Sequence, residues 1–255
     1  MNNFLNSINV IQALIIRDLM VRFGRGNLGF FWTVLEPMIL TAGVMLVWSL
    51  IKEPVIHGIP IITFILTGYM PLTLWRHMTN PVARLLHNNA PLFYHRLISS
   101  IHVAWARLIL EFLSTSISLL LVYFIVVSTG LMDPAEDYSL ILCAWIFTAW
   151  YFGALGLAIC AWTERSEILE KFIQPSQYLA LPVSGVFFMV DWVPTGAQNL
   201  LLLNPSVHCF EMFRAGMLGE GIVTHYSPLY MAASSTLMSI IALSAMYRLR
   251  DPGQA

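Results

Sequence analysis

Arg107 and Glu111 are the residues best placed to interact with one another inside an apolar part of the chain. They lie four residues apart near the start of an apolar run, which puts both side chains on one face of a helix. An isolated charge at mid-membrane costs about 2.5 to 3.5 kcal/mol. The spacing therefore predicts a mutual ion pair close to the membrane interface. Glu36 is a third such charge. It either pairs with Arg107 or makes a polar contact near the cytoplasmic gate, with simple interfacial placement as the alternative.

The other polar residues indicate neither catalysis nor metal binding. No nucleophile or metal set accompanies the intramembrane charges. The histidines His77, His87, His95 and His102 are spaced 10, 8 and 7 residues apart, which does not stack two ligands on one helical turn. The three cysteines form no CxxC pair, and two lie in apolar runs, which favours simple packing. We expect no metal and no cofactor in this chain.

The chain also lacks the phosphate-binding loop of ATPases. The pattern GxxxxGK[ST] is missing, because the only lysines are Lys52 and Lys171 and neither follows a glycine. Any energy from ATP must therefore come through a separate subunit. A transport function is favoured over an intramembrane enzyme.

The composition is that of a polytopic membrane protein. Of the 255 residues, 58% are hydrophobic and 11% are charged, and the mean hydropathy is +0.72. This excludes a nucleic-acid-binding function. The first basic residue is Arg17, so the chain does not begin with the charged segment typical of a cleaved signal peptide.

Six apolar runs predict six transmembrane helices in an all-α fold. The first, of about 22 residues, would extend roughly 33 Å, enough to cross the hydrocarbon. The second is interrupted by Gly68 and Pro71, which suggests a kink, and the fifth is too short alone. Ala149, Gly153 and Gly156 give the fourth a smooth face for close helix packing. The runs are residues 30–51, 59–75, 103–128, 140–162, 178–190 and 229–247.

The segments outside these runs divide the chain further. Residues 1–29 are expected to form an interfacial helix and a turn, residues 30–250 the membrane domain, and residues 251–255 a cytoplasmic tail. The helix from Phe4 to Met20 is amphipathic, and it either lies in the membrane surface or packs on protein. Two helical cytoplasmic connections are predicted, at 76–102 and at 163–177 with a break at Pro175. The segment 191–228 is expected to dip into the periplasmic side of the membrane and return, between spans 5 and 6.

The distribution of basic residues fixes the orientation. The termini and the connections after spans 2 and 4 hold ten lysines and arginines, whereas the opposite side holds two. Because basic residues favour the cytoplasmic side, both termini are predicted to be cytoplasmic. Arg17, Arg22 and Arg25 gather at one depth just before Trp32 and Glu36, where they can contact a lipid phosphate or an anionic substrate. The positive-inside rule alone explains these arginines equally well.

A series of short motifs resembles the permeases of polysaccharide-exporting ATP-binding-cassette (ABC) transporters, most nearly the capsule-exporting KpsM group. The motifs follow in the same order over nearly the whole chain. They are Arg17-Asp18, Arg22-Phe23-Gly24, Leu28-Gly29, Trp32, Leu35-Glu36-Pro37, Leu92-Phe93-Tyr94, Ala106-Arg107, Leu110-Glu111, Asn204-Pro205, Val207-His208 and Glu211.

This resemblance implies a homodimer in the bacterial inner membrane, powered by two separate ATPase subunits that bind ATP and Mg²⁺. The expected substrate is an acidic capsular polysaccharide on a lipid anchor, moved from the cytoplasm to the periplasm between the two copies and among membrane lipids. The implied partners further along the route are a periplasmic co-polymerase-like adaptor and an outer-membrane export protein. Exporters of O-antigen, teichoic acid or small molecules share the architecture, and an ATPase-independent channel or scaffold is the alternative from another class.

The resemblance also assigns expected roles to residues. Sugars stack on aromatic faces, so aromatic residues are candidates for the channel lining, with lipid-facing positions as the alternative. The substrate is expected to enter past Arg17, Arg22, Arg25, Trp32 and Glu36. The channel-lining candidates are Trp48, Tyr69, Trp75, Tyr151, Phe187 and Phe188. Coupling to the ATPase is expected at Arg84, Leu92, Phe93, Tyr94 and Arg96. The periplasmic re-entrant group is Asn204, Pro205, His208, Glu211 and Arg214.

Overall fold

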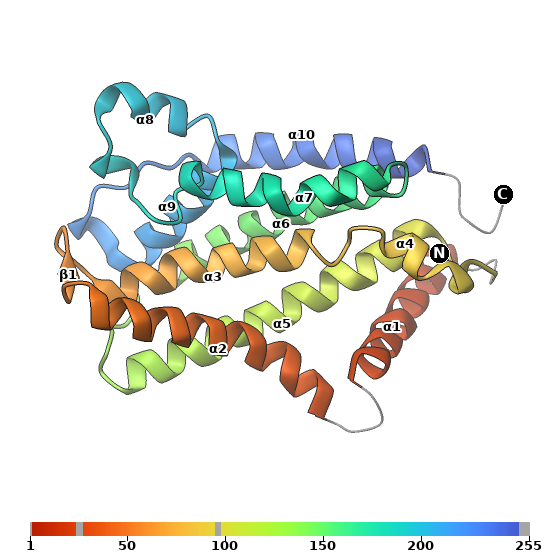
Figure 1. Cartoon of the computed structure of the whole chain (residues 1–255), viewed down its shortest axis with the longest axis horizontal. Coiled ribbons are helices and arrows are strands. Elements are labelled where there is room, and N and C mark those ends of the chain that lie inside the picture. The colour runs from red at the N-terminus through yellow and green to blue at the C-terminus, as the bar shows by residue number, and fades with distance from the viewer. Residues whose placement is uncertain (1, 24–27, 95–97, 250–255) are drawn as a thin grey trace.

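A computed structural model describes residues 2–23, 28–94 and 98–249 of the chain and shows an elongated helical bundle (Figure 1). Long helices run side by side along the bundle, and the start of α1 and the end of α10 lie at the same end. The α-helices are α1 (Asn2–Phe23), α2 (Leu28–Ile51), α3 (Ile61–Thr79), α4 (Leu85–Asn88), α5 (Ser100–Ser128), α6 (Tyr138–Thr163), α7 (Glu167–Ala180), α8 (Thr195–Leu201), α9 (Pro205–Leu218) and α10 (Pro228–Tyr247).

Four of these helices are long and apolar enough to cross a membrane. They are α2 from Phe31 onward, α5, α6 and α10, and each matches a predicted apolar run to within a few residues at either end. Their ends are set by local chemistry. Gly130, with a φ of +71°, follows the end of α5. At the start of α6, the Ser139 hydroxyl and the Leu140 amide donate to the Asp137 carboxylate and hold the pKa of that carboxyl below its usual range.

The described chain contains one short β-hairpin besides its helices and loops. Strands β1 (Val55–Ile56) and β2 (Ile59–Pro60) pair in antiparallel register, with Val55 opposite Pro60. His57 and Gly58 both have positive φ at the turn between them, as a two-residue hairpin requires. Four short 3₁₀ helices complete the described structure: η1 (Ala90–Tyr94), η2 (Leu181–Val183), η3 (Val190–Trp192) and η4 (Gly219–Gly221). The expectation of an all-α fold is confirmed apart from the hairpin.

The break expected at Pro175 is absent, and the predicted run that contains Gly68 and Pro71 is a single helix. Helix α3 runs unbroken through Gly68 and Pro71 and extends to Thr79, four residues beyond the predicted run. Helix α7 likewise continues through Pro175 to Ala180. The run 178–190 is not one helix, because it holds the end of α7, η2, a turn and the start of η3. Helix α7 instead begins within the predicted connecting helix 163–177 and extends three residues beyond it.

Helix α6 is the centre of the bundle and packs on α3, α9 and α10. Its small-residue face is used where it meets α3. A Cβ atom built on Gly156 would lie 2.1 Å from the carbonyl oxygen of Met78, and no side chain fits there. Gly68 has a similar role on α3, since a Cβ there would lie 2.6 Å from the carbonyl oxygen of Val186. The predicted close packing of α6 is thus confirmed, and Gly68 allows a second close approach, between α3 and the backbone of Val186.

Candidate functional site

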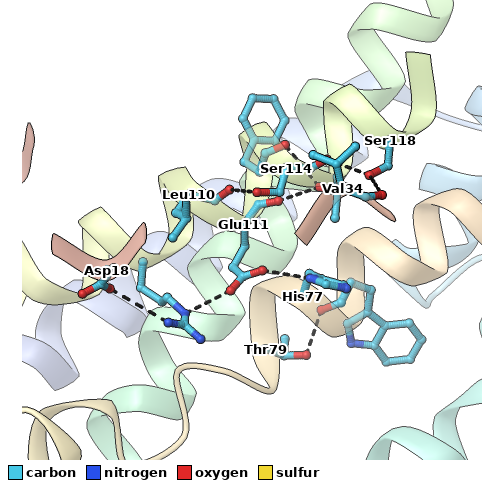
Figure 2. A network of polar contacts seen from close by, with 12 residues as sticks. Asp18, Val34, His77, Thr79, Leu110, Glu111, Ser114 and Ser118 are labelled. Atoms are coloured by element: carbon cyan, nitrogen blue, oxygen red, sulfur yellow. Dashed lines mark hydrogen bonds and ion pairs between the residues drawn. The ribbon is translucent and has the colours of Figure 1, made fainter. Parts of the chain in front are cut away.

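The pair predicted between Arg107 and Glu111 is present on α5. Nε of Arg107 lies 3.0 Å from Oε1 of Glu111, and the Glu111 side chain is only 1% exposed. A carboxylate this deeply buried needs further partners. His77, from the end of α3, supplies one, with its Nδ1 2.8 Å from Oε2 of Glu111 (Figure 2).

Helix α1 joins the same group through Asp18. Oδ2 of Asp18 lies 3.9 Å from Nη1 of Arg107, while Oδ1 accepts from Nε of Arg17 at 3.0 Å. Arg17 also donates to the Asn89 side chain at 2.7 Å, which ties α1 to the connection between α4 and η1. We call these five charged or titratable residues, Arg17, Asp18, His77, Arg107 and Glu111, the charge network. It joins three segments that lie far apart in the sequence, namely α1, α3 and α5.

The network explains why α1 is amphipathic. Leu14 and Asp18 are both buried, and α1 packs against α5 and α2. Through Asp18, the polar face of this helix therefore contacts the protein interior. This is what the second interpretation of the amphipathic pattern, a helix that packs on protein, predicts. Among the described residues, the Arg107 guanidinium lies next to the carboxylates of both Glu111 and Asp18.

A polar cavity of about 490 Å³ opens between α2 and α3, beside the charge network. Glu36 and Leu40 line it from α2, where both are exposed. His77 belongs to the cavity wall and to the charge network at once. The other polar and aromatic groups of the wall include Tyr69, Thr73, Arg76 and Asn80.

The expected coupling segment is held from a second side by the connection between α6 and α7. The backbone amide of Arg84, a residue with a φ of +51°, donates to the Thr163 hydroxyl at 3.0 Å. The Glu164 carboxylate accepts from the amides of Leu86 and His87 at the start of α4. The Arg84 guanidinium lies 3.6 Å from Glu167 and 3.5 Å from Glu170 at the start of α7. These contacts connect the segment directly to the start of α7.

Tyr94 is a large aromatic residue that the same segment exposes. Its side chain is 86% exposed, whereas Phe93 is buried and Leu92 packs partly on the core. Arg96 lies outside the described residues, as does Arg25, and the side chain of Arg22 is not described either.

At the other end of the bundle, Glu211 and Arg214 of α9 form a buried ion pair. Both residues were expected in the periplasmic re-entrant group, but their pairing was not predicted from the sequence. Both side chains are 0% exposed, and Nη1 of Arg214 lies 3.7 Å from Oε1 of Glu211. The guanidinium donates to the carbonyl oxygens of Gly185, Val186 and Phe188, each at 2.7 Å. It also lies over the Phe64 ring, 4.7 Å from the centroid.

Glu211 completes this clamp by accepting backbone amides. Val190 donates to its Oε1 at 3.2 Å and His225 to its Oε2 at 2.9 Å. At the start of α9, Asn204 caps the helix and Pro205 occupies the first turn. His208 lies 2.8 Å from the carbonyl oxygen of Leu202. The five predicted re-entrant residues thus lie on one helix and its cap, and two of them hold the segment 185–190.

The aromatic candidates for a channel lie in different surroundings. Trp48 of α2 stacks on Phe187 with ring centroids 6.4 Å apart, and Phe187 is exposed. Trp32 is also exposed on α2. Trp75 is only 5% exposed and stacks on Phe152 inside the bundle, which leaves it little surface to offer to a channel. Tyr151 packs edge-on against Phe152, and Phe188 gives its carbonyl to Arg214.

His77 and His102 contact other polar side chains in the part of the chain that is described. Within these residues, no group of three or more histidine, cysteine or acidic side chains is arranged to hold a metal ion. His102 lies 3.1 Å from the Ser99 hydroxyl at the start of α5, and His77 belongs to the charge network. The involvement of His77, Asp18 and Asn89 was missed by sequence reasoning, since no local spacing relates them to Glu111 or Arg17.

Comparison with known proteins shows the family to which the chain belongs. Residues 9–218 match the family described as ABC-2 type transporter. The chain is 33% identical to the capsule polysaccharide export inner-membrane protein CtrC of Neisseria meningitidis serogroup A, over 94% of this chain and 90% of that protein. It is 33% identical to the capsule polysaccharide export inner-membrane protein BexB of Haemophilus influenzae, over 92% and 88%. The polysialic acid transport protein KpsM of Escherichia coli is 24% identical, over 94% and 93%.

Proposed function

Because this chain belongs to the ABC-2 type transporter family, we propose that it is the inner-membrane permease of an ATP-driven exporter of capsular polysaccharide. The observation that carries the proposal is the match to capsule export proteins along nine-tenths of the chain. The chain is a transport subunit and not an enzyme. The relatives named above are capsule or polysialic acid transporters, which favours capsule over O-antigen, teichoic acid or a small molecule.

Six crossings of the membrane are part of this proposal. Four helices meet the length and composition of a span, and α3 and α7 lie beside them in the bundle with alternating chain direction (Figure 1). Helix α7 with η2 would supply the fifth crossing in place of the run 178–190. An even number of crossings agrees with basic residues at both ends of the chain. Helices α8 and α9 would then form the re-entrant periplasmic segment.

The proposed assembly is a homodimer with two ATPase subunits that bind ATP and Mg²⁺. The substrate would be an acidic polysaccharide on a lipid anchor that passes between the two copies and on to the periplasmic adaptor and the outer-membrane export protein. Trp48 and Phe187 are the aromatic pair best suited to face it, since Phe187 is exposed on the surface of the single chain.

We propose that the ATPase docks on residues 84–94. Tyr94 supports this assignment, because a large exposed aromatic side chain is a frequent anchor at protein interfaces. Two sets of contacts would carry the motion onward. Arg84 connects the segment to α7 through Glu167 and Glu170, and Asn89 connects it to α1 through Arg17.

Charge reversal at Arg84 tests the coupling. Arg84→Glu replaces the attraction to Glu167 and Glu170 by repulsion. We therefore expect the rate of export to fall by roughly 5- to 150-fold, which is the factor that a typical allosteric coupling free energy produces. ATP hydrolysis by the purified complex should remain near the wild-type rate. Surface capsule and the ATPase rate of the complex are the two measurements.

Arg165→Glu is the matched control for this experiment. Arg165 is exposed on the same connection and forms no ion pair within the described residues, so its reversal should leave export unchanged. Wild-type capsule levels in Arg84→Glu would refute the coupling role. If the wild-type chain formed no stable complex with its ATPase and showed no substrate-stimulated hydrolysis, an ATPase-independent channel or scaffold would replace the exporter.

A further inference from the structure

The cavity between α2 and α3 differs in kind from the other large cavities of the bundle. A cavity of about 450 Å³ between α3, α6 and α7 and one of about 520 Å³ between α5, α6 and α10 are lined mainly by aliphatic and aromatic side chains. The cavity at α2 and α3 holds a carboxylate, a guanidinium, an imidazole and an amide in about 490 Å³. That volume is within the range of about 300 to 1,000 Å³ found for small-molecule sites.

Several of its polar groups remain available to a ligand. Among the described residues, the Glu36 carboxylate and the Arg76 guanidinium take part in no hydrogen bond or ion pair; Arg76 lies only over the Tyr178 ring, 5.4 Å from the centroid. Oδ1 of Asn80 is buried and has no partner within the same residues. Such groups cost free energy when desolvated without a partner, so they favour a ligand that pairs with them.

His77 is held in a fixed orientation at the cavity wall. Its Nδ1 is occupied by Glu111 at 2.8 Å, so only Nε2 is left to meet a ligand. Glu111 is itself held by Arg107. Arg107 and Glu111 thus act as supporting residues that orient the His77 imidazole toward a ligand.

This combination of groups matches one kind of ligand. Guanidinium groups bind carboxylate and phosphate with two parallel hydrogen bonds. A carboxylate and an amide oxygen accept hydrogen bonds from sugar hydroxyls, and the Tyr69 ring offers a face on which a sugar can stack. Aliphatic chains would leave all of these groups unpaired, so a lipid tail does not fit.

We propose that this cavity binds one anionic sugar unit of the exported polysaccharide before it enters the channel. Arg76 would hold the carboxylate or phosphate of the sugar, while Glu36 and Asn80 accept its hydroxyls. Glu36 and Leu40 are exposed at the α2 side, so the cavity is open to the surface of the single chain. The inference rests on the proposed export function and gives it a specific recognition site, located between α2 and α3.

The test measures glycan binding by the full permease–ATPase complex in lipid nanodiscs. The probes are an oligosialic acid, which carries carboxylates, a sugar phosphodiester oligomer, and a neutral maltooligosaccharide. We expect both acidic probes to bind more tightly than the neutral one, and Arg76→Gln to raise their Kd by about ten-fold, the effect of losing roughly 1.4 kcal/mol. Arg76→Lys keeps the charge without the forked geometry and should restore part of the affinity. The tighter of the two acidic probes identifies the anionic group.

Arg165→Gln is the control, since it removes an exposed arginine outside the cavity and should leave every Kd unchanged. A second measurement keeps Arg76 intact. In a Cys143→Ser background, alkylation of Leu40→Cys at the rim should be slowed by the acidic probes and not by the neutral one. Equal binding of neutral and acidic probes, or an unchanged Kd in Arg76→Gln, would overturn the cavity assignment while capsule export persists. If the wild-type complex instead showed no ATP-dependent export, the proposed function itself would be overturned.

Discussion

Arg214 shows how a single residue holds an irregular segment in place. The carbonyl oxygens of Gly185, Val186 and Phe188 all point toward its guanidinium, and Glu211 balances the charge. Away from water these carbonyl groups have few alternatives, because each unpaired polar group is costly in an apolar environment. The five donors of an arginine in a planar fork meet this need, and a lysine does not.

Loss of Arg214 should therefore destabilise the protein strongly. Arg214→Gln leaves three carbonyl groups and the Glu211 carboxylate without their cation, and breaking a buried ion pair in this way costs about 3 to 5 kcal/mol. Thermal unfolding of the purified chain in detergent measures the effect. Glu136→Gln serves as the control, because that carboxylate is exposed in the loop before α6. A melting temperature equal to that of the wild type would show that the clamp is dispensable.

The charge network makes His77 and Asp18 part of one structure despite their distance in the sequence. His77 touches both the polar cavity and Glu111, and Arg17 touches Asn89 next to the proposed docking segment. A series of direct contacts thus runs from the cavity through α5 and α1 to residues 84–94. Figure 2 shows its part from His77 through Glu111 to Asp18. This arrangement gives a physical route by which binding in the cavity and motion of the ATPase can influence one another.

At the scale of elements, the contact between α3 and α6 is set by one glycine. A Cβ on Gly156 would overlap the Met78 carbonyl oxygen, which lies on the backbone of α3 and cannot rotate away. We expect Gly156→Ala to separate the helices and to cost about 1 to 3 kcal/mol, the usual effect of overpacking. The stability of the purified protein in detergent is the measurement.

The control for this substitution lies one turn away on the same helix. A Cβ on Gly153 would be 4.0 Å from the sulfur of Met78, which is ordinary contact with a flexible side chain. Gly153→Ala should therefore be nearly neutral. If both alanine variants were equally stable, α3 and α6 would have to pack less closely than described.

For the whole molecule, the alternating direction of the helices predicts which loops share a side of the membrane. In a chain without native cysteines, single cysteines replace Asp133, Arg165 and Asn199, which are exposed in the α5–α6 loop, the α6–α7 connection and α8. If α6 and α7 both cross, a membrane-impermeant maleimide should label Asp133→Cys and Asn199→Cys from the periplasm and Arg165→Cys only after lysis. Labelling of Arg165→Cys and Asn199→Cys from the same side would mean that α7 does not cross.

The sequence by itself determined the features that depend on local spacing and hydropathy. The four long apolar helices, the Arg107–Glu111 pair and the close-packing face of α6 follow from runs and repeats within one helix, so they were predictable. The order of short motifs likewise identified the family. These properties need no knowledge of what lies across the bundle.

Only the tertiary structure decided how distant segments complete one another. His77 lies 34 residues from Glu111, and Asn89 lies 72 residues from Arg17, so no periodicity relates them. A break was expected at Pro175, yet α7 continues through it to Ala180, and α3 is one helix through Pro71. The polar cavity arises because α2 and α3 place Glu36 and Arg76 on the same opening. Pairing of this kind depends on the packing of whole helices, which is a property of the assembled bundle and not of any single stretch of sequence.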